Sequence, residues 1–194
     1  MTRPADPAAH AADPTNASVA VWPRWLRLLH WSLAASVIAS FATHEGGGRL
    51  HEWLGWLALA LALLRLPMGF ASRWRHARFA DFVRGPAATL AYARALLARR
   101  APRHLGHNPL GGWMMLLLLA DTLACGATGW LFTTDAYWGT EWLEDLHGAL
   151  GHAFIPLLLL HVAGAVHASR SHRENLVRAM LTGRKRAPGP GDIG

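Results

Sequence analysis

Four long apolar stretches constrain the fold of this chain more than any other feature of its sequence. They cover residues 25–43, 51–70, 110–132 and 146–168. Each is close to the roughly 20 residues with which a helix crosses a hydrocarbon core of about 30 Å. A closed β-barrel is the other arrangement that lipid tolerates, but runs such as LALALALL and WMMLLLLA lack the alternation of barrel strands. We therefore predict an all-α fold, an integral membrane four-helix bundle.

The segments at the two ends of the chain have a different composition. Residues 1–21 are rich in Ala, Pro and Asp and contain no apolar core. We expect them to form a disordered tail rather than a cleaved signal peptide, with the first helix acting as an uncleaved anchor. Residues 187–194 have little apolar area to bury, and we expect a second disordered tail there. The membrane domain is then expected to span residues 22–186.

Basic residues are distributed unevenly along the chain, and this distribution predicts the topology. Residues 71–109 hold eight arginines and one acid, whereas residues 133–145 hold four acids and no base. More basic residues precede the first apolar stretch and follow the last one. Because cytoplasmic loops of membrane proteins carry the excess of Lys and Arg, we expect both termini and the long middle loop in the cytoplasm.

The high sequence pI, about 11.1, could also suggest a nucleic-acid-binding protein. The basic residues flank the apolar stretches, however, and no helix-turn-helix or zinc-finger pattern accompanies them. We therefore expect no nucleic-acid partner and assign this charge to the membrane surface. Within the basic middle loop, segment 86–100 is either a basic helix lying on the anionic inner leaflet or a solvated connecting helix.

Histidines in the apolar stretches are the strongest indication of chemistry, because ionisable side chains are costly in lipid. His147 and His161 are 14 residues apart, nearly four helical turns, so they share one helix face about 21 Å apart along the axis. With the first helix running outward, His30 lies at the depth of His161, and His51 matches His147. His44 is also near the outer depth, but it adjoins a glycine run, and we prefer His51.

A single membrane histidine usually bonds to a neighbouring helix, but four at two matched depths favour paired metal ligands. Imidazoles on facing helices are a common way to hold haem iron. Cys125 is the only cysteine, so a CxxCH attachment is impossible and any haem must be non-covalent, of the b type. We predict two bis-histidine haem b groups, one held by His30 and His161 and the other by His51 and His147.

The motifs around these histidines resemble those of the prokaryotic cytochrome b-561 family, which includes the cytochrome b subunits of nickel-iron hydrogenases. RLLHW, LHEWLGW with LLRLPMGF, and DLHGALGHAFIPLLLLHVAGAVH are similar to its first, second and fourth helices. RHARFADFVRGP, LGHNPLGGW and VRAMLTGRKR are similar to segments of its small stand-alone subgroup. The resemblance covers about residues 22–186. It implies a bacterial inner membrane protein whose haem ligands are His30, His51, His147 and His161.

Several other residues are each open to more than one interpretation. Arg65, at the cytoplasmic end of the second stretch, either neutralises a haem propionate or extends toward the lipid headgroups. Asp121, in the middle of the third stretch, is a protonated structural acid, a partner of Thr122 or a proton relay. His104 and His107 are expected to form hydrogen bonds where the third helix begins. The acidic segment 133–145 either docks a basic cytochrome or only complements the charge bias of the loops.

These features predict an electron-transfer protein rather than an enzyme with substrate chemistry at the iron, because two histidines leave no open coordination position. We expect electrons to pass between the membrane quinone pool and a c-type cytochrome or a dehydrogenase or hydrogenase subunit, within a respiratory chain. One alternative is a free-standing superoxide:quinone oxidoreductase, and another is a haem-free, histidine-lined metal transporter or scaffold. The direction of electron flow, the quinone type and the formation of a homodimer stay open.

Overall fold

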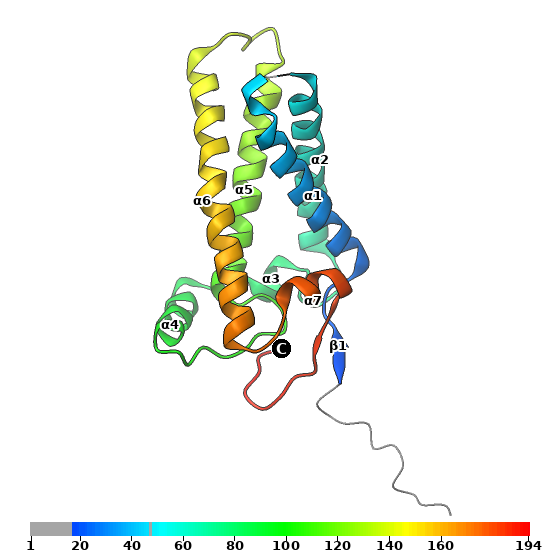
Figure 1. Ribbon diagram of the computed structural model, residues 1–194, viewed down its shortest axis with the longest axis vertical. Coiled ribbons are helices and arrows are strands. Elements are labelled where there is room, and N and C mark those ends of the chain that lie inside the picture. Colours follow the sequence, from blue (N-terminus) through cyan, green and yellow to red (C-terminus); the bar gives the residue numbers. More distant parts are fainter. Residues whose placement is uncertain (1–16, 47) are drawn as a thin grey trace, which may run out of the picture.

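Four long helices form the body of the protein (Figure 1). The computed structural model describes residues 17–46 and 48–194. The long helices are α1 (Arg24–Ala42), α2 (Arg49–Ala71), α5 (Pro109–Phe132) and α6 (Glu141–Ser171). Each is long and apolar enough to cross a membrane, and they coincide with the four apolar stretches of the sequence. The predicted all-α integral membrane bundle is therefore confirmed.

Short elements gather at one end of the bundle, which we call the lower end, where β1 and the C-terminus lie (Figure 1). The short elements are β1 (Ser18–Ala20), η2 (His44–Gly46), α3 (Phe79–Phe82), α4 (Pro86–Leu97), α7 (Leu176–Thr182) and β2 (Arg184–Arg186). β1 pairs antiparallel with β2, with Val19 opposite Lys185. All of these except η2 lie at the lower end. The upper end carries η2 and the loop that joins α5 to α6.

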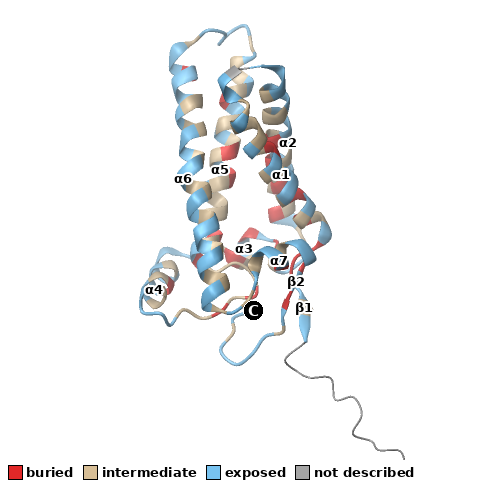
Figure 2. Ribbon diagram, in the orientation of Figure 1, coloured by how far each residue is buried: buried red, intermediate tan, exposed pale blue. Residues whose placement is uncertain are grey.

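Most positions along the four long helices are exposed or intermediate, and few are buried (Figure 2). On α2, Ala58 and Ala62 are buried, whereas Leu63 is 50% exposed. Lipid tails are as apolar as leucine, so helices in a membrane associate by close packing of small residues and have no need to bury large ones. The exposed leucines of this bundle are suited to contact with lipid.

The long helices pack in chain order, α1 against α2, α2 against α5, and α5 against α6. The start of α5 is fixed by Asn108, whose side-chain oxygen accepts a hydrogen bond from the backbone N–H of Gly111 at 2.8 Å. Pro109 follows as the first helical residue, a position where its missing N–H costs nothing. This packing leaves α1 and α6 to face each other through side chains.

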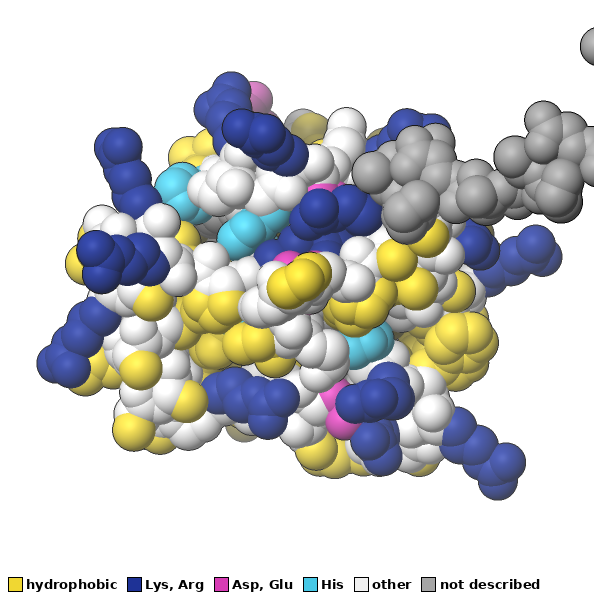
Figure 3. All heavy atoms as spheres, turned by 90° about the horizontal axis from the view of Figure 1, so that it is seen from below, with side chains coloured by type: hydrophobic (Ala, Val, Ile, Leu, Met, Phe, Trp, Pro, Cys, Tyr) yellow, Lys and Arg dark blue, Asp and Glu magenta, His cyan; other side chains and the backbone are white. Residues whose placement is uncertain are grey.

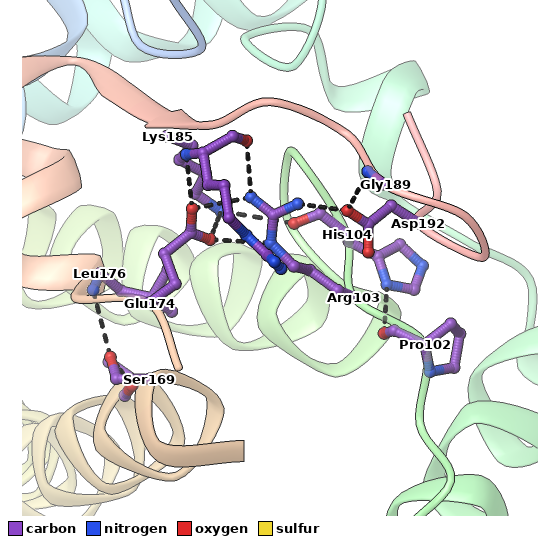
Figure 4. Close-up of polar contacts among 11 residues, drawn as sticks. Pro102, Arg103, His104, Ser169, Glu174, Leu176, Lys185, Gly189 and Asp192 are labelled. Carbon is purple, nitrogen blue, oxygen red and sulfur yellow. Dashed lines mark hydrogen bonds and ion pairs between the residues drawn. The ribbon is translucent and has the colours of Figure 1, made fainter. Parts of the chain in front are cut away.

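A buried ionic network closes the lower end (Figure 4). Arg103 is 4% exposed and forms ion pairs with Glu174 at 2.7 Å and with Asp192. The backbone N–H of Ile193 also donates to the Arg103 carbonyl at 2.8 Å. Residues 187–194 therefore pack on the protein and differ from the disordered tail that their composition suggested. The reason is that a buried guanidinium needs carboxylate partners, and these come from distant parts of the chain.

The N-terminal segment differs from expectation in a similar way. Residues 18–20 of the expected N-terminal tail form β1, and the backbone N–H groups of Val21 and Trp22 both donate to the Gly183 carbonyl, at 2.9 and 3.1 Å. Residues 1–16 lie outside the described residues. The ordered structure therefore extends beyond the expected domain, residues 22–186, at both ends.

Candidate functional site

The first histidine pair joins α1 to α6 in the lower half of the bundle, and we call it the inner pair. The ring centroids of His30 and His161 are 6.3 Å apart, with their planes inclined at 46°. Both side chains are half-buried. The Nδ1 atom of His30 is buried and has no hydrogen-bond partner in the described part of the chain. The structure therefore brings together the two residues that the depth argument paired.

The second pair joins α2 to α6 in the upper half, and we call it the outer pair. The ring centroids of His51 and His147 are 6.1 Å apart and their planes are nearly perpendicular, at 89°. The Nδ1 atom of His51 lies 2.8 Å from the carbonyl oxygen of Ser40, and that of His147 lies 3.1 Å from the carbonyl oxygen of Cys125. A carbonyl oxygen only accepts, so each Nδ1 carries the proton and each Nε2 keeps its lone pair.

The two separations match those of imidazoles that share one iron. A metal–imidazole bond is about 2 Å long and the ring centre lies about 1 Å behind the nitrogen, so axial ligands on opposite sides of one metal have centroids about 6 Å apart. No group of three or more His, Cys, Asp or Glu side chains that could hold a bare ion is present in residues 17–46 and 48–194. Two imidazoles at this separation suit a metal whose remaining donors come from a macrocycle.

Two glycines leave space beside the outer pair and on the face of α6 between the two pairs. A Cβ carbon on Gly129 would lie 3.1 Å from Cε1 of His147, so the missing side chain lets this ring pack directly against α5. A Cβ carbon on Gly151, which lies on the α6 face between the two pairs, would meet no atom within 4 Å. This open face can accept a flat macrocycle. The role of Gly129 was missed in the sequence, because glycine is frequent in transmembrane helices and a single one does not indicate which side chain packs on it.

His44 has a different neighbour from the one considered in the sequence. Its ring lies 6.5 Å from that of His152, and both side chains are exposed. The Nδ1 atom of His44 lies 2.6 Å from the Phe41 carbonyl oxygen. The ring packs on Phe41 at a centroid distance of 5.0 Å. The preference for His51 as the neighbour of His147 therefore agrees with the geometry.

Arg65 is directed into the protein rather than toward the surface. It is 6% exposed, donates from NH2 to the Ala77 carbonyl at 2.8 Å, and holds its guanidinium 4.8 Å from the ring centroid of Phe79. Its NH1 atom is buried without a hydrogen-bond partner among the described residues. Of the two interpretations of Arg65, extension to the headgroups does not fit, and a buried donor available to an anion such as a propionate does.

His107 also lies in the protein interior at the lower end of the bundle. Its ring is 5.0 Å from that of Trp22 and 4.7 Å from that of Phe82, and its Nδ1 has no hydrogen-bond partner within residues 17–46 and 48–194. Burial, with a contribution from the nearby Lys185 charge, lowers the pKa of His107 to about 3. The expected hydrogen-bonding role at the start of α5 is filled by Asn108 instead.

Asp121 lies near the middle of α5, and one of its three interpretations is removed. The hydroxyl of Thr122 donates to the Leu118 carbonyl at 2.8 Å, so it is not engaged with the aspartate. One carboxylate oxygen of Asp121, Oδ2, is buried without a hydrogen-bond partner in the described part of the chain. A protonated structural acid and a proton relay both remain compatible with this position.

Comparison with known proteins agrees with the geometry. The family model described as prokaryotic cytochrome b561, of the nickel-iron hydrogenase cytochrome b type, matches residues 21–183. No curated protein and no solved structure matches the chain. The match covers all four long helices and both histidine pairs. The chain therefore belongs to the prokaryotic cytochrome b561 family, and its role is electron transfer by haem b in a bacterial membrane.

Proposed function

We propose that the protein is a di-haem b-type cytochrome that passes electrons across the membrane between the quinone pool and a redox partner. His30 and His161 would ligate one haem, and His51 and His147 the other. The observation that carries this proposal is the presence of two imidazole pairs with centroid separations of 6.3 and 6.1 Å, placed at two levels of one bundle. Two stacked sites of this kind suit electron transfer from one side of the membrane to the other.

The residues around the pairs fit the proposed cofactor. The carbonyl oxygens of Ser40 and Cys125 fix the outer imidazoles with Nε2 free to bind a metal. Arg65 holds a buried cationic donor, NH1, that lacks a protein partner in the described structure and would neutralise a propionate. A bound haem supplies a one-electron Fe(III)/Fe(II) couple. If both histidines of each pair bind the iron, no coordination position would be left for a substrate.

The charge distribution supports an orientation with both termini in the cytoplasm. Lys and Arg side chains are numerous on the lower face (Figure 3), where the described N-terminal segment and the C-terminus lie. At the opposite end Asp135, Glu141, Glu144 and Asp145 are all exposed. By the positive-inside rule the lower face would lie in the cytoplasm of the bacterial cell. The acidic upper end would then face outward, where it suits a basic partner such as a c-type cytochrome.

Haem counting on ligand variants tests the proposal. Purified protein should show a b-type reduced-minus-oxidised spectrum with two haems per chain. Single substitutions should each remove one haem, and the variants to compare are His30→Ala, His161→Ala, His51→Ala and His147→Ala. His30→Ala and His161→Ala should affect the same spectral component. His44→Ala and His152→Ala are matched controls that should retain both haems. Full haem content in the four ligand variants would overturn the proposal.

A further inference from the structure

We infer that hydrogen bonds on the outer imidazoles make the outer site the lower-potential member of the pair. The inference rests on the proposed di-haem function and concerns the side chains and carbonyls that surround each ligand. An imidazole whose Nδ1–H is held by an acceptor is a more basic ligand, and hydrogen bonds of this kind tune the potential of a bound metal. The two pairs differ in this respect.

At the outer pair, His51 is held by both the backbone and the side chain of one residue on α1. Its Nδ1 lies 2.8 Å from the Ser40 carbonyl oxygen and 3.2 Å from the Ser40 hydroxyl. The hydroxyl also lies 3.4 Å from the His51 carbonyl oxygen, to which it donates. The lone pairs of the Ser40 hydroxyl oxygen are therefore free to accept a hydrogen bond from Nδ1–H of His51, as the Ser40 carbonyl oxygen does.

His147 is held in the same way from α5. Its Nδ1 lies 3.1 Å from the Cys125 carbonyl oxygen and 3.0 Å from the Thr128 hydroxyl. Thr128 donates its own proton to the Cys125 carbonyl at 2.9 Å. The hydroxyl is therefore an acceptor toward His147, and both outer imidazoles have two acceptors at Nδ1.

His30 of the inner pair has no such acceptor in the described structure. Nδ1 of His30 is buried and unpartnered among residues 17–46 and 48–194, and the nearest ring apart from His161 is that of Trp31, which meets it edge-on at 5.1 Å. His161, the other inner imidazole, is half-buried and lies with its ring centroid 6.3 Å from that of His30. The His30 imidazole therefore lacks the acceptors that both outer imidazoles have at Nδ1, and it would be a weaker electron donor than they are.

A buried charge toward the lower end of α2 acts in the same direction. The cationic Arg65 is buried toward the lower end of α2, and a nearby positive charge favours the reduced state of an iron centre. If both sites bind haem and share one electron, that electron would reside mainly at the inner site, with no bond formed or broken.

Redox titration of hydroxyl variants tests the inference. The full-length protein with both haems bound should titrate as two one-electron components. Thr128→Val removes one acceptor from His147, and Ser40→Ala removes one from His51. Either change should raise the lower midpoint potential and leave the upper one in place. The ferric low-spin EPR signal of the same component should shift with it, a readout that does not depend on turnover.

Two matched controls separate this effect from general perturbation. Thr122→Val and Ser36→Ala each remove a buried hydroxyl from the same helices, α5 and α1, and both hydroxyls bond only to their own helix, at Leu118 and Leu33. Neither control should move a midpoint potential. Three results would overturn the inference: one midpoint potential for both haems of the wild type, a shift of the higher midpoint potential in the variants, or shifts no larger than in the controls. Each of these results would leave the two haems and the proposed function intact. If Thr128→Val loses haem, the midpoint potentials of Ser40→Ala decide whether the inference holds.

Discussion

The imidazole of His147 packs directly against Gly129, where a Cβ carbon would lie 3.1 Å from Cε1 of the ring. This separation is tighter than an ordinary van der Waals contact, so the ring must shift if the glycine acquires a side chain. The proposed outer site therefore depends on a residue of α5 that would not itself touch the metal. This dependence is directly testable.

Gly129→Ala should disturb the outer site selectively. We expect the ring of His147 to be displaced by a few tenths of an ångström, with about 1–3 kcal/mol lost to overpacking. The measurement is the haem content together with the EPR signal of the outer component. Gly126→Ala is the matched control, because its Cβ carbon would meet Leu59 at 2.9 Å instead of an imidazole. Equal spectra for the two variants would show that His147 is not the sensitive group.

Arg65→Met should weaken haem binding at the inner site. The substitution removes a buried charged donor, and hydrogen bonds to charged groups are worth about 1.5–3 kcal/mol, or roughly a 10- to 100-fold fall in affinity. Titration of the haem-depleted protein with haem measures this change. Arg65→Lys should recover part of the affinity because it restores the charge. Arg73→Met, at an exposed position, should bind haem as the wild type does.

Arg103→Met should destabilise the lower end of the molecule. It leaves the carboxylates of Glu174 and Asp192 without the guanidinium that both contact, and breaking a buried pair typically costs about 3–5 kcal/mol. Thermal unfolding in detergent measures the effect. The control is Arg78→Met, which breaks an i,i+3 pair with Asp81 at a site where the arginine is 44% exposed and where solvent leaves such a pair with little effect on stability. A similar change in both variants would contradict the buried network.

Acid should release the C-terminal segment before it unfolds the bundle. Burial alone would raise the pKa of Glu174, but hydrogen bonds from Arg103 and the Arg186 backbone outweigh it and lower that pKa overall. The pKa of Asp192 is lowered in the same way, by the Gly189 backbone and Arg103. Carboxyl groups with lowered pKa values contribute stability above their ordinary pKa and lose it as the pH falls through the folded value.

Hydrogen exchange of residues 187–194 measures this release. Protection should be constant near neutral pH and should fall in acid, below the ordinary carboxyl pKa range. In Arg103→Met the protection should already be low at neutral pH, and its dependence on acid should be weaker. Protection that persists in the wild type at low pH would contradict the role of these two carboxylates.

The sequence predicted the parts of the protein that depend on local composition and helix period. The four spans follow from the length of the apolar stretches. The pairings of His30 with His161 and of His51 with His147 follow from the residue spacing within α6 and the direction of each helix. The structure places both pairs at closely similar ring separations. Their role as haem ligands stays a prediction.

The contacts that the sequence did not predict join residues far apart in the chain. Arg103 and Asp192 are separated by 89 positions, and no local pattern indicates that they meet. The neighbour of His44 depends on how α1 inclines toward α6, which brings His152 close. Similarly, the buried position of His107 depends on Trp22 and Phe82. Composition alone could not distinguish these residues from ordinary loop residues.

Helix α6 contributes one imidazole to each pair, His147 above and His161 below, so a rigid rotation of this helix would turn both rings at once. Pro156 lies inside this continuous helix between them, where its missing N–H removes one backbone hydrogen bond. The helix ladder is therefore weaker between the two imidazoles than elsewhere in α6. A bend of α6 at this proline would move one imidazole relative to the other.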